Sequence, residues 1–599
     1  MKYIFLVFFV FLTCISCEGQ QLEEPSPPAY VQVVPDNWAQ HQKIKQVSKQ
    51  SYIKKHQIAF DWFADFPFSE TDGTPFIILK LLPIISPENW GSKDNFLDAV
   101  GLFADERMPG YPVARGIGFS AQSRGGNHNN IDYASFTCAA CHIGRVKKSD
   151  EKIEYIDGGV NAEFNIVQYR VRLFKTIQKI IGKETDEDKQ GQLAVKAFIS
   201  ALDQMHKADP NYFYQNYNNG RLNLDTGYEK AQVALFKEKA DKVIPKFIKR
   251  SIAEYSGYVA LLEKNYAGYI DESVKGFPGM ADATGISTVN GYIAAQDSFF
   301  GRLFASFFLP PKPGITDFMS VWEQDNRKAE WDKDHQTLVN GGGQWNGNIP
   351  IPMYRNLAAQ LTLGLENNDI RVSAFGVELL AGLPATVYPF DVDINLASKG
   401  QQLFKDNCAQ CHQPHNGKVY SDMGTSLNRS YVVNWLIRQA AIKGFSEICS
   451  PETTITMVSK QEQPCAEFDG VSLVDKESLI MSPGSQHHGY NARPLNGIWA
   501  QAPYLHNGSV PTIYHLLMPE ERPATFVKSR LDYDTNYLGF SWQIDPDNKA
   551  GYLFNTQGMT SFSNAGHDID ITEGEHTYKL NWADDRDGAK AIIEYLKTL

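Results

Sequence analysis

Apolar positions recur at helical spacing in three separate stretches of this 599-residue chain. The spacing predicts one helix over about residues 165–181, a second that runs into Cys408, and a third over the last turns of the sequence. Asp584 and Asp585 supply a start signal and negative charge at the amino end of the third helix. The positions that carry the three patterns are Ile166, Tyr169, Leu173, Ile177 and Ile180; Leu396, Gly400, Leu403 and Phe404; and Ala589, Ile592, Ile593 and Leu596.

Alternation of apolar and polar positions, which marks a half-buried strand, is scarce in the sequence. Proline- and glycine-rich stretches over 309–314 and 341–352 predict loops, and the charged run 183–189 predicts a solvated turn. The stretch Tyr388-Pro389-Phe390 is typical of a linker. We therefore expect a mainly α fold with long irregular loops, little β structure and no extensive sheet.

The amino-terminal residues have the pattern of an export signal. Lys2 precedes an almost wholly apolar run from Ile4 to Ile15, which is too short to span a membrane comfortably. A small residue, Ser16, then precedes Cys17, and this resembles a bacterial lipoprotein signal in which Cys17 becomes the lipidated first residue of the mature chain. Because Cys14 stands where such signals usually have leucine, simple signal-peptide cleavage is the alternative. No later segment is predicted to cross a membrane.

Two copies of a Cys-x-x-Cys-His motif occur, at Cys138-Ala139-Ala140-Cys141-His142 and at Cys408-Ala409-Gln410-Cys411-His412. Two thiols at this spacing can add to the two vinyl groups of one porphyrin, and the next residue presents an imidazole to the iron from the same side. A zinc site, which would need a second ligand pair nearby, and a reducible disulfide are the alternatives. Two copies in an exported chain indicate two covalently attached c-type haems, with His142 and His412 as the proximal iron ligands.

The remaining cysteines indicate the redox compartment of the chain, and the overall charge limits the kind of partner it binds. Cys449 and Cys465 are left as an even pair, which favours a disulfide in an oxidising compartment, with two free thiols as the alternative. The formal net charge of -12 and the pI of about 5.7 argue against nucleic acid as a main partner.

The helix before the second motif and the C-terminal helix match the first and last helices of a small c-type cytochrome domain, which pack against each other. Gly400 would allow their close crossing. We therefore expect a C-terminal cytochrome c domain over 389–599 with a long insertion, and a larger N-terminal haem domain over 41–388. Ahead of them, we expect a lipoprotein-like signal peptide over 1–17 and a polar, proline-rich tether over 18–40.

A long stretch towards the carboxyl end carries a recognisable pattern. It reads Arg493-Pro494-Leu495-Asn496-Gly497-Ile498-Trp499-Ala500, and then Ala502-Pro503-Tyr504-Leu505-His506-Asn507-Gly508-Ser509-Val510-Pro511-Thr512. This resembles the signature of dihaem c-type enzymes, a superfamily that includes bacterial cytochrome c peroxidases and MauG, and it is most similar to the rubber oxygenase branch. The resemblance covers most of the chain from about residue 90 onward, with further matching pieces at 317–322, 344–348 and 564–567.

The resemblance implies a division of labour between the haems. One is six-coordinate and transfers electrons, and in the rubber oxygenase branch its second axial ligand is a histidine close to the C-terminus, which His567 matches. Met481 is the rival ligand, and a methionine would raise the reduction potential whereas a second histidine would lower it. Trp322 matches a tryptophan that lies between the haems in this superfamily and can relay electrons or hold an oxidising equivalent, which makes it the candidate catalytic residue. A plain core tryptophan is the alternative.

The other haem is where O2 or H2O2 would bind. Related peroxidases place a displaceable distal histidine shortly after the first motif, but residues 143–204 contain none, and His206 follows on a predicted polar helix. His128, in a loop just upstream, is the alternative distal ligand. We therefore expect this haem to be open or weakly ligated, as activation of oxygen or peroxide requires. Of the other histidines, His506 is expected to be structural. We expect the remaining three, His415, His487 and His488, to lie at the surface.

Together these features favour an exported dihaem oxidoreductase that activates O2 or H2O2 at the N-terminal haem. The C-terminal haem would exchange electrons with a donor or acceptor protein. Peroxidase chemistry, oxidation of a protein and dioxygenase cleavage of an apolar organic substrate all stay open, because one fold can host several chemistries. A non-enzymatic dihaem electron carrier is the alternative. We expect the chain in the periplasm, anchored by lipid to the outer membrane, or secreted. Related peroxidases that resemble this architecture hold a calcium ion, but no compact carboxylate loop in this sequence indicates a calcium site.

Overall fold

The computed structural model describes residues 31–599 except for 127–128, 266–277, 297, 329, 333–336, 340–344, 346–348, 350, 363–366, 434, 450–451, 457–461, 466–487, 544–550 and 558. About 49% of the chain is helical and 11% is strand, so the mainly α expectation is confirmed. Some sequence predictions lie outside the described residues, namely the signal peptide with Cys17, most of the tether, most of the loop over 341–352, and the histidines and methionine His128, Met481 and His487.

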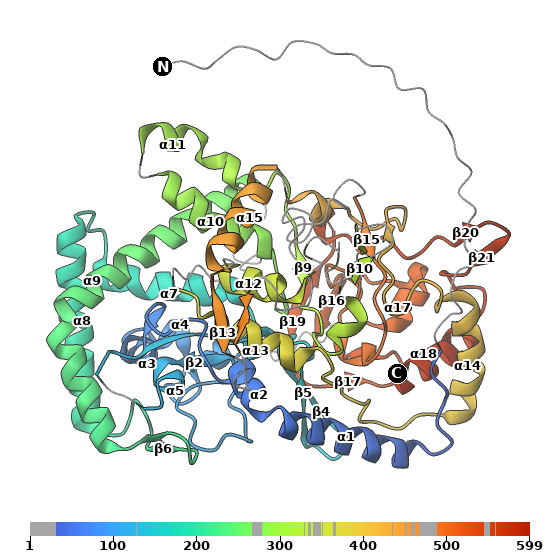
Figure 1. Cartoon of the computed structure of the whole chain (residues 1–599), viewed down its shortest axis with the longest axis horizontal. Coiled ribbons are helices and arrows are strands. Elements are labelled where there is room, and N and C mark those ends of the chain that lie inside the picture. Colours follow the sequence, from blue (N-terminus) through green and yellow to red (C-terminus); the bar gives the residue numbers. More distant parts are fainter. Residues whose placement is uncertain are drawn as a thin grey trace, which may run out of the picture.

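Helices dominate the amino-terminal two thirds of the chain (Figure 1). They are α1 Trp38–Lys55, α2 Gln57–Ala64, α3 Phe76–Ile85, α4 Pro87–Trp90, α5 Ser120–Ser123, α6 Ala139–His142, α7 Ile166–Ile181, α8 Glu187–Ala208, α9 Thr226–Asn265, α10 Ala283–Ala295, α11 Phe299–Phe304, α12 Pro352–Thr362 and α13 Ile370–Leu380. The later helices are α14 Ile394–Asn407, α15 Trp435–Ile448, α17 Ile513–Leu517 and α18 Arg586–Thr598. Short 3-10 helices are η1 Phe96–Val100, η3 Ala305–Phe308, η4 Gln324–Arg327, η5 Asn428–Tyr431, η8 Ile498–Gln501, η9 Pro519–Glu521 and η10 Thr560–Phe562.

The three long helices α7, α8 and α9 pack against one another. α7 begins after Asn165, whose side chain accepts a hydrogen bond from the amide of Gln168 (3.0 Å), and the helix predicted over 165–181 is thereby confirmed. α8 starts at Glu187, inside the charged run that was expected to be a turn. The reason is that Asp186 caps this helix, and acidic residues suit its amino end.

The helices α14 and α18 cross in close contact (Figure 1). A Cβ atom at Gly400 would lie only 1.9 Å from the carbonyl oxygen of Ala591, so the crossing requires glycine. Asp585 caps the amino end of α18. Both helices and their close approach were predicted from the sequence, and all three predictions are confirmed.

Strands are short and scattered over the described part of the chain. One sheet has three strands in the order β1-β3-β2, and the others are two-stranded antiparallel ladders. The bounds are β1 Thr74–Pro75, β2 Ile117–Phe119, β3 Tyr133–Phe136, β4 Ile143–Lys147, β5 Ile153–Asp157, β6 Tyr217–Asn218, β7 Asn223–Leu224, β8 Met280–Ala281, β9 Thr316–Asp317, β10 Glu330–Asp332, β11 Thr337–Val339, β12 Val419–Tyr420, β13 Thr454–Thr456, β14 Glu462–Pro464, β15 Tyr490–Asn491, β16 Thr525–Lys528, β17 Tyr533–Asp534, β18 Gly539–Phe540, β19 Tyr552–Asn555, β20 Ile571–Glu573 and β21 His576–Tyr578.

One apolar core runs through both of the domains expected from the sequence. Tyr388 and Phe390, expected in a linker, are buried in this core, and the indole N–H of Trp38 donates to the carbonyl oxygen of Phe390 (2.8 Å). The chain therefore joins the fold before residue 40, where the tether was expected to end, because burying the Trp38 ring stabilises the start of α1. The division between residues 388 and 389 falls inside a shared core.

None of the helices in the described ranges is both long and apolar enough to cross a membrane.

Candidate functional site

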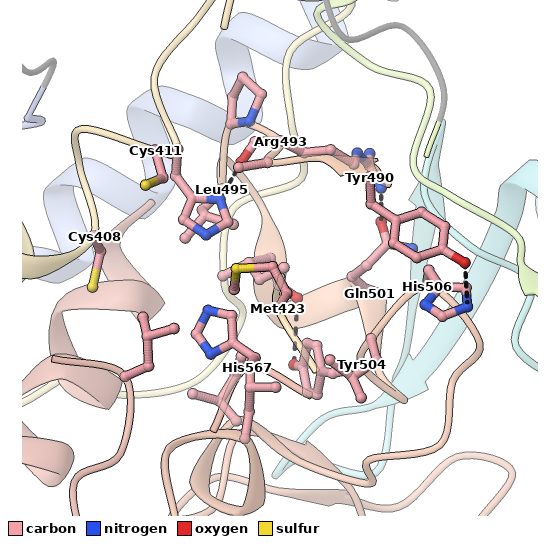
Figure 2. A pocket seen from close by; sticks show the side chains of 18 of the residues that line it. Cys408, Cys411, Met423, Tyr490, Arg493, Leu495, Gln501, Tyr504, His506 and His567 are labelled. Carbon is pink, nitrogen blue, oxygen red and sulfur yellow. Dashed lines mark hydrogen bonds between the residues drawn. The ribbon is translucent and has the colours of Figure 1, made fainter. Parts of the chain in front are cut away.

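The second Cys-x-x-Cys-His motif follows directly from the end of α14. The amide of Cys408 donates to the carbonyl oxygen of Phe404 (2.8 Å) and caps the carboxyl end of the helix. The amides of Cys411 and His412 then donate to the carbonyl oxygen of Cys408 (3.2 and 3.0 Å). This tight turn places both thiols and the imidazole on the wall of one cavity, seen in Figure 2.

The wall of this cavity is largely apolar. It is built by α14, α17 and α18, which contribute Phe404, Leu516, Leu517, Ile592 and Leu596. Burial raises the pKa of the Cys408 thiol to about 12, whereas reactive dithiol pairs have lowered pKa values. The cysteines of both motifs are free of disulfides, and the described residues hold no group of three or more His, Cys, Asp and Glu placed for a metal ion.

His412 is oriented by the backbone. Its Nδ1 atom lies 2.6 Å from the carbonyl oxygen of Arg493. Because a carbonyl oxygen can only accept, we assign the proton to Nδ1, and Nε2 then keeps its lone pair for a ligand. Metal-bound histidines are typically held in this way by a partner on the other ring nitrogen.

His567 approaches His412 from a loop on the other side of the cavity (Figure 2). Its amide donates to the carbonyl oxygen of Met423 (2.8 Å), and the preceding Gly566 adopts φ 114°. A Cβ atom at Gly566 would lie 2.5 Å from Cβ of Thr425, so the loop needs glycine there. The centroids of the two imidazole rings are 6.5 Å apart.

This spacing fits one iron between two imidazoles. A metal–imidazole bond of about 2 Å, with the ring centre about 1 Å beyond the nitrogen, sets two such rings about 6 Å apart. Burial lowers the pKa of His412, and burial together with His412 and Arg522 lowers that of His567 to about 3, so both rings are neutral, as metal ligands must be. Two thiols and two neutral imidazoles around an apolar cavity are the donor set of a haem c with two histidine ligands.

The first motif lies in a different setting, at the turn α6 between β3 and β4. Asn161 holds this turn, because its side-chain NH2 donates to the carbonyl oxygen of Ala140 (2.9 Å) and its amide donates to that of Cys141 (2.8 Å). The His142 amide donates to the carbonyl oxygen of Cys138 (3.0 Å), as in the second motif. The two motifs thus share the same local turn but sit on different elements.

No second imidazole is found opposite His142 among the described residues. Burial lowers the pKa of His142 to about 4, against the opposing effect of backbone groups of Gly159 and Met319 that face the ring. Among the described residues, no ring contact or hydrogen bond joins His142 to another histidine, whereas the rings of His412 and His567 form such a pair. His206 lies on α8 beside Glu229, with 3.6 Å between Nδ1 and Oε1.

Trp322 lies between the two motifs. Its indole N–H donates to the carbonyl oxygen of Asn496 (2.9 Å), and Asn496 lines the cavity of the second motif. The other edge of the indole packs against Gly159, where a Cβ would lie 3.1 Å from the ring. Backbone of Gly159 also faces the His142 ring. The indole therefore spans the space between the surroundings of both motifs.

Lys49 lies beside this indole, and no sequence signal pointed to it. Its ammonium group is 5.4 Å from the ring centroid of Trp322 and donates to the carbonyl oxygen of Asp157 (2.6 Å) and to the hydroxyl of Thr386. Burial lowers the pKa of Lys49 to about 8. The amino-terminal helix α1 thus contributes a buried cation to the region between the motifs.

Two buried arginines converge on the carbonyl oxygen of Ser320. The Nη2 atoms of Arg327 and Arg493 both lie 3.0 Å from it. Arg327 Nη1 and Arg493 Nε make no hydrogen bond within the described residues. The buried carboxyl group of Asp317 interacts electrostatically with Arg493, but burial raises the pKa of Asp317 well above the usual range. Haem carries two carboxylate side chains, and the orphaned guanidinium N–H groups fit such anions.

Only one of these arginines lies in a sequence motif, because Arg493 opens the recognisable segment, whereas Arg327 belongs to no motif. His506 is structural, as expected, since its ring stacks on Tyr490 with centroids 4.1 Å apart. His488, expected at the surface, is half-buried instead, because it stacks on Tyr431 at 3.7 Å.

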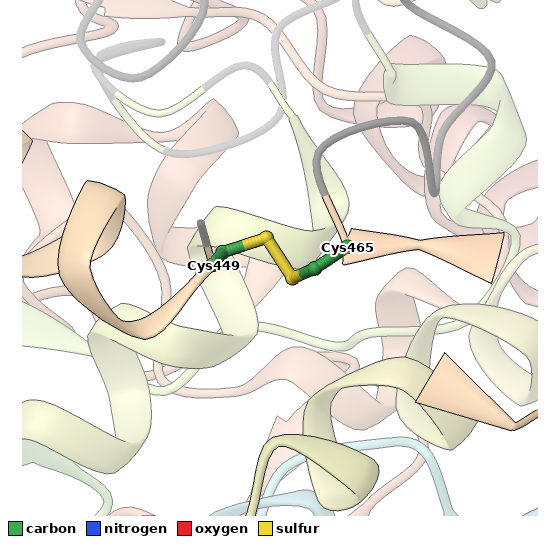
Figure 3. Close-up of a disulfide and its surroundings, with 2 residues drawn as sticks. All are labelled: Cys449 and Cys465. Atoms are coloured by element: carbon green, nitrogen blue, oxygen red, sulfur yellow. A yellow bond between two sulfur atoms is a disulfide. The ribbon is translucent and has the colours of Figure 1, made fainter. Parts of the chain in front are cut away.

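Cys449 and Cys465 form a disulfide that joins the end of α15 to the end of β14 (Figure 3). Their Cα atoms are 5.3 Å apart and both residues are buried. The pairing expected from the cysteine count is confirmed.

Comparisons with known proteins agree with this geometry. Residues 397–447, which hold the second motif, match the cytochrome c family model. Residues 489–527 match a family described as RoxA-like, cytochrome c-like, and residues 58–142, which end on His142, match a Y4iN-like domain.

Three proteins of Sinorhizobium fredii (strain NBRC 101917 / NGR234) are similar to the chain. The uncharacterized protein y4iM is 31% identical over 429 residues, which cover 65% of this chain and 94% of y4iM. The uncharacterized protein y4iJ is 30% identical over 240 residues, 35% of this chain and 39% of y4iJ. The uncharacterized protein y4iN is 26% identical over 104 residues, 16% of this chain and half of y4iN.

The thiol pair, the imidazole and the apolar cavity of the second motif, together with the two cytochrome matches, define a c-type cytochrome, a redox protein with covalently bound haem c. Within that class the chain belongs to the family of the uncharacterized protein y4iM.

Proposed function

We propose that this cytochrome is a dihaem oxidoreductase that activates O2 or H2O2 at a haem on the first motif and transfers electrons through the haem on the second. One observation carries the proposal. His412 faces His567 across a cavity with ring centroids 6.5 Å apart, and among the described residues no such ring contact joins His142 to another histidine. A haem with two histidines is closed to small ligands, and a haem with one keeps a position for them.

Cys138, Cys141 and His142 would hold the first haem, and Cys408, Cys411, His412 and His567 the second. When bound, the first haem would supply an iron position for oxygen or peroxide, and the second a low-potential electron-transfer centre. The residues around them do the positioning. The carbonyl oxygen of Arg493 keeps the proton of His412 on Nδ1, and Asn161 holds the turn that presents His142.

Trp322 supports a route for electrons between the two haems. Its ring lies against Gly159 on the side of the first motif, and its N–H donates to Asn496 on the side of the second. The buried ammonium group of Lys49 beside the ring disfavours a positive charge on the indole. The indole would therefore pass electrons between the two haems and would not hold an oxidising equivalent for long.

The setting that we propose is the bacterial cell envelope. The disulfide between Cys449 and Cys465 supports an oxidising compartment. A lipid on Cys17 would anchor the chain to a membrane, in the periplasm or on the outer membrane, and an electron donor or acceptor protein would be its redox partner. The match of residues 489–527 to the RoxA-like model supports an oxygenase reading with an apolar organic substrate, and peroxidase chemistry is the second candidate.

Turnover assays on the purified holoprotein test this proposal. The protein is given H2O2 with a reduced donor cytochrome and, separately, polyisoprene under O2. We expect steady consumption of one oxidant, and a loss of at least about tenfold in rate for Trp322→Phe. Trp90→Phe is the matched control, because Trp90 is also buried and its indole N–H donates to a side chain, Thr176 on α7 (2.8 Å). Reversible redox titration without turnover on either oxidant would contradict the proposal and identify an electron carrier.

A further inference from the structure

Helix α11 and the 3-10 helix η3 expose a cluster of large apolar side chains. The two elements project from the body of the molecule beyond α10 (Figure 1, upper left). The exposed residues and fractions are Phe299 68%, Phe300 74%, Leu303 61%, Phe304 58% and Phe307 62%. Single exposed apolar residues are ordinary on protein surfaces, but a contiguous group of five marks a binding surface. We call residues 298–308 the aromatic projection.

The backbone of the aromatic projection is tied to the body. Ser298 caps α11 by accepting from the amide of Gly301 (2.9 Å). At the other end, the ammonium group of Lys264 on α9 donates to the carbonyl oxygens of Ser306 (2.7 Å) and Leu309 (2.9 Å). The apolar side chains are therefore displayed by a capped and anchored segment, and the exposure is a property of the fold.

The charge around the aromatic projection differs from that of the chain. Between Asp297 and Gly314 the sequence holds two cations, Arg302 and Lys312, against one carboxylate, Asp297, although the whole chain has a formal net charge of -12. α15 contacts η3 and adds another exposed aromatic residue, Trp435, which is 73% exposed. Aromatic and leucine side chains next to cations are typical of segments that lie at the interface of a membrane.

We propose that the aromatic projection inserts into the headgroup region of an anionic lipid bilayer. The segment is convex and carries apolar tips with a positive charge, which suits a soft, negatively charged surface. A second copy of the chain is a poorer occupant, because a twofold contact would bring Arg302 of both copies together. The contact would act in addition to a lipid on Cys17, since stable membrane association commonly takes two signals.

Vesicle sedimentation tests the proposal. The full-length holoprotein carries Cys17→Ser, so that no acyl chain contributes, and is mixed with phosphatidylcholine vesicles with and without phosphatidylglycerol. We expect binding that is stronger to the anionic vesicles and weakens with salt. The double variant Phe300→Ser/Phe304→Ser should lower the partition coefficient by at least about tenfold, because two buried aromatic rings are lost.

The matched control is Ile44→Ser/Leu553→Ser, which removes two other exposed apolar side chains (59% and 70% exposed) outside the aromatic projection. Its partition coefficient should equal that of the parent, and haem absorbance should show that all forms are folded. Absence of vesicle binding by the parent, or equal binding by the Phe300→Ser/Phe304→Ser variant, would overturn the proposal. A dimer in light scattering that this variant converts to a monomer, with vesicle binding unchanged, would overturn it in favour of a second copy.

Discussion

The imidazole rings of His412 and His567 face each other across an apolar cavity, with 6.5 Å between their centroids. One ring comes from the turn after α14 and the other from a loop just before β20, so the fold itself assembles the pair. The distance leaves room for one metal between two nitrogen atoms. The ring of His142 has no such partner among the described residues, and the difference between the motifs follows from this contrast.

Replacing His567 should open the second haem. We expect His567→Ala to convert this haem from a six-coordinate, low-spin centre to one that binds CO when reduced, as visible absorption and resonance Raman spectra would show. His576→Ala is the control, because His576 is exposed on β21. If the spectrum of His567→Ala is that of the parent and Met481→Leu changes it instead, the methionine is the ligand and the assignment of His567 is wrong.

Removing a buried positive charge near the haems should lower a reduction potential. Reduction of the iron lowers its positive charge, so the guanidinium of Arg327 favours the reduced state. We expect Arg327→Gln to lower the potential by several tens of millivolts, measured by spectroelectrochemical titration. Arg327→Lys keeps the charge and should shift the potential less. Equal potentials in the parent and Arg327→Gln would mean that no haem lies near this guanidinium.

The crossing of α14 and α18 should not tolerate a methyl group. Gly400→Ala would force its Cβ towards the carbonyl oxygen of Ala591, 1.9 Å away, and we expect a loss of about 2–3 kcal/mol in the free energy of unfolding. Urea denaturation followed by circular dichroism measures it. Gly444→Ala on α15 is the control, because no atom lies within 4 Å of its added Cβ, and it should be neutral or stabilise by up to about 1 kcal/mol.

A buried carboxyl group on α9 should make stability depend on pH. Burial raises the pKa of Glu229 from 4.5 to about 7. Because the protonated form is favoured in the folded state, the stabilisation is fully present below about pH 4.5 and is lost as the pH rises through about 7.

The parent should therefore lose free energy of unfolding between these pH values, by an amount on the order of 2 kcal/mol once partial solvent screening is allowed for. In Glu229→Gln this loss should be absent or much smaller. Thermal unfolding at several pH values checks this, with the exposed Glu238 on the same helix, as Glu238→Gln, for the control. A parallel pH profile in Glu229→Gln and the parent would show that another group dominates.

The local features of this fold could be predicted from the sequence. The helix α7, the two helices that cross at Gly400 and the two Cys-x-x-Cys-His turns all depend on residues within a few positions of one another. His567 was found by resemblance alone, since nothing in its neighbourhood predicts that its loop reaches the cavity.

The long-range features could not be predicted. Trp38 and Phe390 are joined by a hydrogen bond across 352 positions, and this contact places α1 against the expected linker. Lys49 is buried by partners far away in the chain, and Arg327 by irregular backbone. No periodic pattern in the sequence therefore predicts that these charged side chains are buried. Periodicity reports which face of an element is apolar, but it does not report which other element covers that face.

Carbon monoxide titration of the reduced holoprotein, with the haem content determined on the same sample, tests most directly whether the two haems differ. We expect two covalent haems per chain and one bound CO, with two CO in His567→Ala. A parent protein with two haems and no CO binding, or with a single haem on Cys408 and Cys411, would refute this expectation.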